Sequence, residues 1–83
     1  MGERNEQMIE IKGLKGERYF INPAEVIYVR ADLITLHIYL RRSEPIHIQY
    51  LNRQGTDENA LEESLQAIIK GVDEYNTTHK SEN

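Results

Sequence analysis

The stretch Ile34-Thr35-Leu36-His37-Ile38-Tyr39-Leu40 alternates strictly between aliphatic side chains and polar or aromatic ones. A period of two is typical of a β-strand with one buried and one open face. The even-numbered aliphatic side chains must be covered by another part of the chain. The odd-numbered side chains can meet water or a partner, and these two faces organise the rest of the sequence.

Segments on either side of this strand continue the sheet. Val26-Ile27-Tyr28-Val29 is β-branched and aromatic, which favours a strand. A two-residue corner at Asp32-Leu33 places Ala31 opposite Ile34 and Val29 opposite Leu36, with Ile27 opposite Ile38, and so matches the apolar faces of both strands.

The strand from Ile46 to Leu51 has Ile46, Ile48 and Tyr50 on the aliphatic face. This face requires an odd number of loop residues, either 41–43 or 41–45. Pro45 favours the longer loop, because proline cannot donate to a strand ladder and is best placed at the start of an edge strand.

The chain before these strands predicts a hairpin and one helical turn. Met8 to Lys12 and Arg18 to Ile21 flank the turn residues Gly13-Leu14-Lys15-Gly16. A two-residue turn pairs Ile11 with Phe20 and a longer loop pairs it with Tyr19, so the register stays open. Asn22-Pro23-Ala24-Glu25 has a capping side chain, a proline and an acidic residue in the order of a helix start.

The period changes to that of a helix from Thr56 onward. Thr56 or Asp57 can cap it, and Gly71 weakens it by about 1 kcal/mol relative to Ala. The apolar stripe predicts a helix to about Tyr75 and consists of Leu61, Leu65, Ile68, Ile69, Val72 and Tyr75. We expect one domain over residues 7–75, with disordered ends at 1–6 and 76–83.

These elements predict an α+β fold. It is an antiparallel β-meander of four to five strands with one C-terminal amphipathic helix packed on one face. A sheet curled into a small barrel, with the helix at one end, is the structural alternative.

Composition narrows the function classes. The chain has 83 residues and no cysteine, which excludes thiol catalysis and thiolate metal sites. No apolar window reaches the length of a membrane span, so we expect a cytoplasmic location. The net charge is -4. Because residues 57–75 hold one Lys against six Asp and Glu, the chain lacks the basic footprint of a nucleic-acid binder, and nucleic acid is an unlikely partner.

The predicted face opposite the helix is more aromatic and apolar than solvation requires. A homodimer or protein partner that buries it would compensate for a small core. The candidate interaction face comprises Val26, Tyr28, Arg30, Thr35, His37, Tyr39, His47 and Gln49.

The residues that could bind a metal or act as an acid and base are explained equally well as ordinary surface residues. His37 and His47 share a side of the sheet, and Glu44 or Gln49 could join them around a metal, but this spacing is typical of ordinary surface histidines. The pairs Glu62-Glu63 and Asp73-Glu74 fit a solvated helix face. We therefore predict no catalytic, cofactor-binding or metal-binding residues.

The run from Ile9 to Tyr39 resembles small bacterial flagellar and swarming-motility proteins. The shared residues are turn and core residues, which imply a β-meander and assign no functional residue: Leu14, Gly16, Tyr19, Ile21, Asn22, Pro23, Ile27, Ile34 and Leu36. The loop 41–45 and the long acidic helix depart from that pattern. Val26-Ile27-Tyr28-Val29 is also similar to LytTR-type DNA-binding domains.

The sequence thus predicts a non-enzymatic protein-interaction or regulatory accessory module that self-associates. The alternative is a nucleic-acid-binding accessory domain that uses the outer sheet face, since Tyr28 and Tyr39 could stack on bases.

Overall fold

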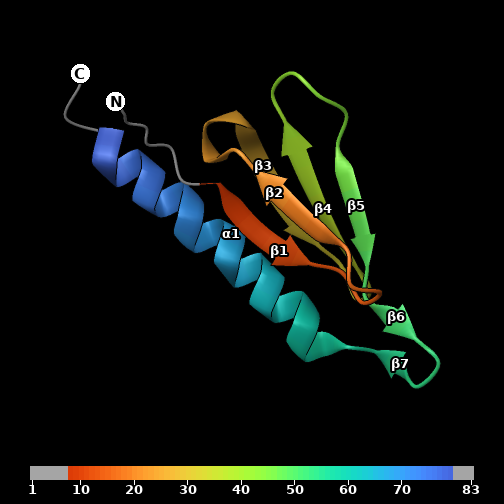
Figure 1. Cartoon of the computed structure of the whole chain (residues 1–83). Coiled ribbons are helices and arrows are strands. Elements are labelled where there is room, and N and C mark those ends of the chain that lie inside the picture. Colours follow the sequence, from red (N-terminus) through yellow and green to blue (C-terminus); the bar gives the residue numbers. More distant parts are fainter. Residues whose placement is uncertain (1–7, 80–83) are drawn as a thin grey trace.

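The computed structural model describes residues 8–79 and has the expected α+β architecture. The predicted disorder of residues 1–6 lies outside the described residues. Figure 1 shows the elements in chain order: β1 (Ile9–Lys12), β2 (Arg18–Ile21), the 3-10 turn η1 (Pro23–Glu25), β3 (Val26–Ala31), β4 (Thr35–Leu40), β5 (Ile46–Gln49), β6 (Leu51–Asn52), β7 (Gly55–Thr56) and α1 (Glu58–His79).

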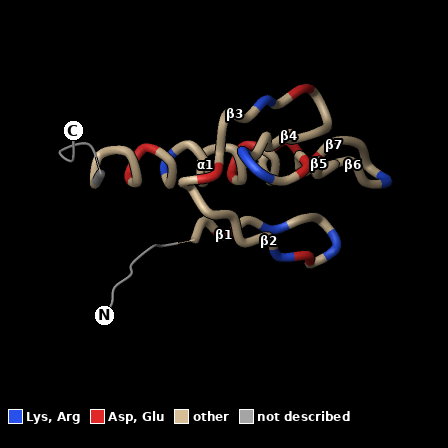
Figure 2. The backbone as a smooth tube through the Cα atoms, turned by 90° about the horizontal axis from the view of Figure 1, so that it is seen from above, with Lys and Arg blue, Asp and Glu red and all other residues tan. Residues whose placement is uncertain are grey.

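The strands are antiparallel and form three groups. β1 pairs with β2, β3-β4-β5 make a three-stranded sheet in that order, and β6 pairs with β7. The expected five strands are therefore divided between two sheets, because η1 redirects the chain between β2 and β3. Seen from above, β1 and β2 lie to one side of α1 and β3 lies to the other (Figure 2).

The first hairpin adopts the longer-loop register of the two that were open. Ile11 lies opposite Tyr19, and Gly13 N donates to the carbonyl oxygen of Glu17 at 2.9 Å. Gly16 has φ of +88°, a left-handed conformation that glycine adopts without steric cost.

The single helical turn after β2 is confirmed. The Asn22 side chain accepts a hydrogen bond of 2.9 Å from Ala24 N, and Pro23 occupies the first turn position. Val26 already has extended backbone angles, so the turn ends where the β-branched residues begin.

The register of β3 against β4 differs from the prediction by two residues. Ala31 lies opposite Leu36, and Val29 lies opposite Ile38. A wider corner accounts for this shift, because the Asp32 carboxylate accepts hydrogen bonds from the backbone N–H groups of Ile34 and Thr35.

A β-bulge lies between Val26 and Tyr28. The extra residue, Ile27, is 57% exposed and does not join the aliphatic face as predicted. The same bulge places Val26 opposite Leu40, where it packs against the core. Bulges of this kind reverse which face a side chain takes.

β4 and β5 pair in the register of the shorter of the two loops. Ile38 lies opposite Ile46 and His37 opposite His47. The preference for the longer loop was therefore wrong as to register, although residues 41–45 all lie outside the strands. Pro45 has no N–H to give to the ladder, so β5 begins only at Ile46.

The helix begins at the predicted cap and runs further than predicted. Asp57 Oδ1 accepts a hydrogen bond of 3.1 Å from Ala60 N, which satisfies one of the unpaired N–H groups of the first turn. Because α1 ends at His79, residues 76–79 of the predicted disordered tail are helical. Residues 80–83 lie outside the described part. Within residues 8–79, no helix is long and apolar enough to cross a membrane.

The packed face of α1 is turned slightly from the predicted stripe. Leu61 and Ile68 are buried as expected, but Ser64 is buried with them and Ile69 is 46% exposed. Figure 1 shows that α1 runs alongside β1. A Cβ at Gly71 would lie only 2.5 Å from Ile9 Cγ1, so this glycine permits the close approach of helix and strand.

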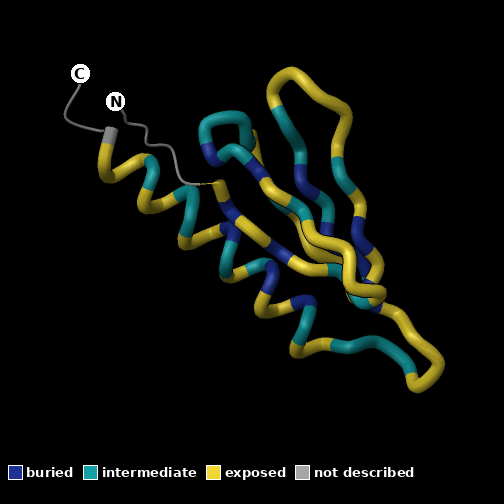
Figure 3. The backbone as a smooth tube through the Cα atoms, in the orientation of Figure 1, coloured by how far each residue is buried: buried dark blue, intermediate teal, exposed yellow. Residues whose placement is uncertain are grey.

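The core lies where α1 and the two sheets meet, and buried segments face each other across it (Figure 3). Its buried hydrophobic residues are Ile9, Ile11, Ile21, Leu36, Ile38, Ile48, Tyr50, Leu61 and Ile68.

Tyr50, which follows β5, is linked by hydrogen bonds to β1 and to α1 across the core. Its hydroxyl lies 3.0 Å from the carbonyl oxygen of Lys12 and 2.8 Å from Ser64 Oγ. Because a phenol has one proton, Tyr50 donates to Lys12 and accepts from the Ser64 hydroxyl. Burial raises the pKa of the Tyr50 hydroxyl.

Candidate functional site

The open face of the β3-β4-β5 sheet keeps six of the eight predicted residues. We call this set the outer face: Tyr28, Arg30, His37, Tyr39, His47 and Gln49. The other two differ from the prediction, Val26 in its face and Thr35, which lies opposite Gln49, in its exposure. Val26 moves to the core side because of the bulge, and Thr35 is only 9% exposed, so neither contributes much contact surface.

Two tyrosines form the aromatic part of the outer face. Tyr28 lies directly opposite Tyr39, and their rings stack with centroids 4.5 Å apart and planes inclined by 11°. Each ring therefore holds its neighbour in place. Arg30 NH2 lies 3.4 Å from the Tyr39 hydroxyl, a long hydrogen bond that links the aromatic pair to the rest of the face.

Asp32 occupies the corner between β3 and β4. Its Oδ1 accepts hydrogen bonds from Ile34 N at 3.3 Å and Thr35 N at 2.9 Å, and its own N donates to the Thr35 carbonyl oxygen at 3.0 Å. An aspartate that binds the backbone of the following residues in this way fixes a tight turn. The second carboxylate oxygen is thereby aimed along the outer face.

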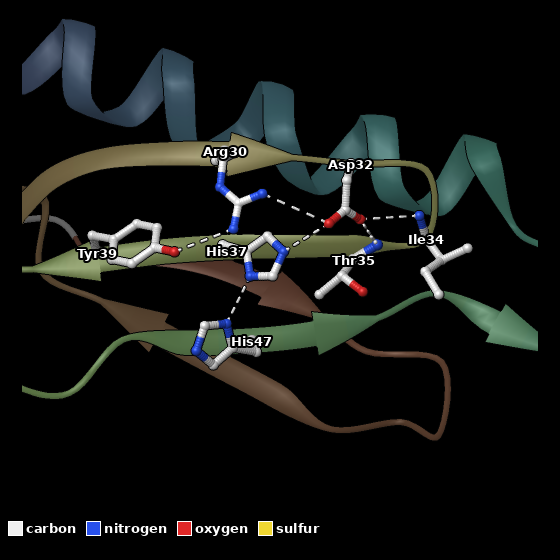
Figure 4. Close-up of polar contacts among 7 residues, drawn as sticks. All are labelled: Arg30, Asp32, Ile34, Thr35, His37, Tyr39 and His47. Atoms are coloured by element: carbon white, nitrogen blue, oxygen red, sulfur yellow. Dashed lines mark hydrogen bonds and ion pairs between the residues drawn. The ribbon is translucent and has the colours of Figure 1, made fainter.

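That oxygen begins a chain of polar contacts across the sheet, shown in Figure 4. Asp32 Oδ2 lies 3.0 Å from His37 Nε2, and His37 Nδ1 lies 2.7 Å from His47 Nδ1. Because an ionised carboxylate only accepts, the proton of neutral His37 is on Nε2. His37 Nδ1 is then an acceptor, and His47 Nδ1–H donates to it. We call these three residues the Asp–His–His chain.

Charge on this face is balanced. The hydrogen bond from His37, followed by the backbone bond from Thr35, lowers the pKa of the Asp32 carboxyl. Arg30 NH1 lies 3.8 Å from Asp32 Oδ2. The His37 side chain is 14% exposed and is covered on one side by its neighbours, whereas His47 is exposed.

Asp32 was missing from the predicted face. The sequence places it only in a corner, yet an Asp at the first position of a tight corner is a signal that its side chain binds the backbone of the turn. What the sequence does not contain is the two-residue change of register that brings this carboxylate beside His37.

Other candidates for chemistry stay apart from this face. Glu62, Glu63, Asp73 and Glu74 are exposed along α1, in keeping with a solvated helix side. A pocket at the β6-β7 hairpin and the start of α1 includes none of the outer-face residues; it is lined by Asn52, Gln54, Thr56, Asp57, Glu58 and Asn59.

The fold and this face define a small α+β chain with an open, ordered sheet surface. Comparisons with protein-family models, curated proteins and solved structures gave no significant match. The resemblances to flagellar and swarming-motility proteins and to LytTR-type domains therefore stay predictions.

Proposed function

We propose that this chain is a non-enzymatic protein-interaction module that associates with a second copy of itself through the outer face. The proposal includes a regulatory or accessory role in the cytoplasm of a bacterium, in keeping with a chain that contains no cysteine.

The stacked tyrosines are the observation that carries this proposal. Tyr28 is 52% exposed although it is held against Tyr39. Tyrosine contributes a large amphipathic contact area, and a side chain already fixed by its neighbour loses little entropy when it is covered. Tyrosine and arginine are also the residue types that carry most binding energy at protein interfaces.

The surroundings of the stack extend the contact area. Ile27 and Leu33, at the start of β3 and just after it, are 57% and 87% exposed. Ile27 is the neighbour of Tyr28 in β3, whereas Leu33 lies in the β3-β4 corner at the other end of the strand. Exposed apolar side chains on such a surface add to the area that a partner can bury.

A second copy is favoured because the outer face is complementary to itself. It carries Arg30, and Asp32 lies beside this arginine in the adjoining corner. A two-fold axis through the face can therefore place the arginine of each copy near the aspartate of the other. Domains of this size bury only about 60% of their unfolded surface, so covering this face would also add stability.

Nucleic acid is the weaker candidate on the same geometry. The two tyrosine rings stack on each other, which leaves each only one ring face for a base. Arg30 is the only Lys or Arg of the outer face, and it faces the Asp32 carboxylate. Figure 2 shows acidic positions along α1, which would repel a phosphate backbone.

Sedimentation equilibrium tests the proposal. We expect the wild-type chain to be dimeric at high micromolar concentration, and Tyr28→Ser to weaken the dimer at least about tenfold, as removal of an interface tyrosine does. Phe20→Ser is the matched control, because Phe20 on β2 is 54% exposed and lies away from the outer face, so this variant should dimerise normally.

A wild-type chain that stays monomeric at that concentration would contradict self-association. Equal weakening by both substitutions would contradict the choice of face. A gel shift whose affinity falls steeply with salt would instead support the nucleic-acid alternative.

A further inference from the structure

The Asp–His–His chain brings two imidazole nitrogens to one point, which the sequence spacing alone does not show. His37 and His47 are paired directly across β4 and β5, and their Nδ1 atoms lie 2.7 Å apart. In the neutral pair, one proton lies between two nitrogens whose lone pairs are directed at the same place. A metal ion can replace such a shared proton, because both need the same lone pairs. The proton then leaves Nδ1 of His47 to solvent, and His47 takes the other neutral tautomer, with its proton on Nε2.

The separation is close to what a metal ion needs. Metal–imidazole bonds are about 2.0–2.1 Å long, so two such nitrogens on one ion lie roughly 2.9–3.4 Å apart, depending on the angle between the bonds. Relative to 2.7 Å, the two rings must therefore separate by only about 0.2–0.7 Å and turn toward the ion. Because His47 is exposed, its ring can make this adjustment.

Asp32 fixes the tautomer and the ring orientation of one of the two ligands, His37. A histidine that binds metal commonly donates its other N–H to a carboxylate, which fixes the tautomer and the ring orientation. His37 Nε2 makes this contact with Asp32 Oδ2 at 3.0 Å. The Nδ1 atom of His37 is thereby held unprotonated and directed at His47, while Asp32 is itself fixed by the backbone of the corner.

We propose that His37 and His47 form a two-imidazole binding site for a divalent transition-metal ion such as Zn²⁺, Ni²⁺ or Cu²⁺. Imidazole suits these ions, whereas Mg²⁺ and Ca²⁺ prefer oxygen ligands. Within residues 8–79, no group of three or more His, Cys, Asp or Glu side chains is placed to hold a metal. Water therefore completes the coordination sphere. Asp32 is a positioning residue, and the inference does not rest on the proposed self-association.

Titration calorimetry with Zn²⁺ at pH 7.5, in a buffer that does not bind metals and with protein dilute enough to be monomeric, tests the site. We expect one ion per chain. His47→Gln should weaken binding more than tenfold, because even the loss of an outer-shell partner costs about 10–100-fold. His79→Gln is the matched control, since it removes the remaining histidine of the described chain. The Zn²⁺ affinity of this variant should stay within about twofold of wild type, well short of the loss expected for His47→Gln.

Asp32→Asn distinguishes positioning from simple folding. An asparagine retains the oxygen that accepts from the corner, but its NH₂ group then faces His37 Nε2 and favours the opposite tautomer, with the proton on Nδ1. We expect a loss of at least about tenfold in Zn²⁺ affinity. The ¹⁵N spectrum of the imidazole rings should show the reversed tautomer of His37 in a folded protein.

The imidazole spectra also decide the assignment. Zn²⁺ should shift the Nδ1 signals of both His37 and His47 in the wild-type chain. The proposal fails if no binding occurs at millimolar Zn²⁺, if His47→Gln binds as tightly as wild type, or if His79→Gln abolishes binding.

Discussion

Replacing Gly71 by alanine sets two effects of opposite sign against each other. At an exposed helix position this change stabilises a protein by about 1 kcal/mol. Here the new Cβ would lie 2.5 Å from Ile9 Cγ1 and 2.6 Å from Ile9 Cδ1, whereas carbon atoms pack best about 3.5–4.0 Å apart. The helix, or the buried Ile9, must therefore move by about 1 Å.

The structure predicts that crowding outweighs propensity. Overpacking a core costs typically about 1–3 kcal/mol, and the helix gain offsets about 1 kcal/mol of this. Gly71→Ala should therefore lower the free energy of unfolding by about 0–2 kcal/mol. Urea unfolding followed by far-UV circular dichroism measures this difference.

A double-mutant cycle with Ile9→Ala isolates the contact. Ile9→Ala alone removes both crowded atoms and costs about 2–5 kcal/mol as a core truncation. In that background the alanine at position 71 meets no obstacle and should stabilise by up to about 1 kcal/mol. The two substitutions should thus couple by about 1–3 kcal/mol. If Gly71→Ala stabilised the wild-type chain by the full helix increment, the close approach of α1 and β1 would be refuted.

Three further predictions concern the polar contacts. Tyr50→Phe leaves the Lys12 carbonyl and the Ser64 hydroxyl without their partner and should cost about 1–3 kcal/mol in urea unfolding. Because the pKa of Tyr50 is raised on folding, its contribution to stability is present below about pH 10 and is lost as pH rises through the folded pKa. Alkaline unfolding should therefore begin at lower pH in the wild-type chain than in Tyr50→Phe, when each protein is compared with its own stability at neutral pH. The pKa of Asp32 is lowered on folding, first by the hydrogen bond from His37. Its contribution to stability is therefore present above about pH 4 and is lost as pH falls through the folded pKa. Asp32→Asn should flatten the dependence of stability on pH in that acid range, and an unchanged dependence would count against the Asp32–His37 contact.

The fold could be anticipated wherever a side-chain period was unambiguous. The alternation from Ile34 to Leu40 and the helical stripe from Leu61 to Val72 each fixed an element, and Asn22 correctly marked the single helical turn. These are local signals, since the backbone geometry of a few residues decides them.

Register could not be anticipated, because it depends on how turns close. The Asp32 corner widened the β3-β4 connection, and the bulge at Ile27 turned Val26 toward the core. Neither change breaks the alternation of the neighbouring strand, so the pattern alone gave no warning. The site was affected most, because the Asp–His–His chain exists only in the observed register.

The helix shows the same limit. The predicted stripe included Ile69, yet Ser64 is buried and Ile69 is exposed. Ser64 faces the core because its hydroxyl is hydrogen-bonded to Tyr50, and Gly71 lets the helix approach β1. A hydrophobic pattern records which side chains are apolar and carries no information about such pairings.

Intermolecular nuclear Overhauser effects in a mixture of labelled and unlabelled chains test the central claim most directly. We expect contacts between copies at the rings of Tyr28 and Tyr39 in the dimer. Contacts confined to Phe20, Leu51 or Ile69, with none at the two tyrosines, would contradict it.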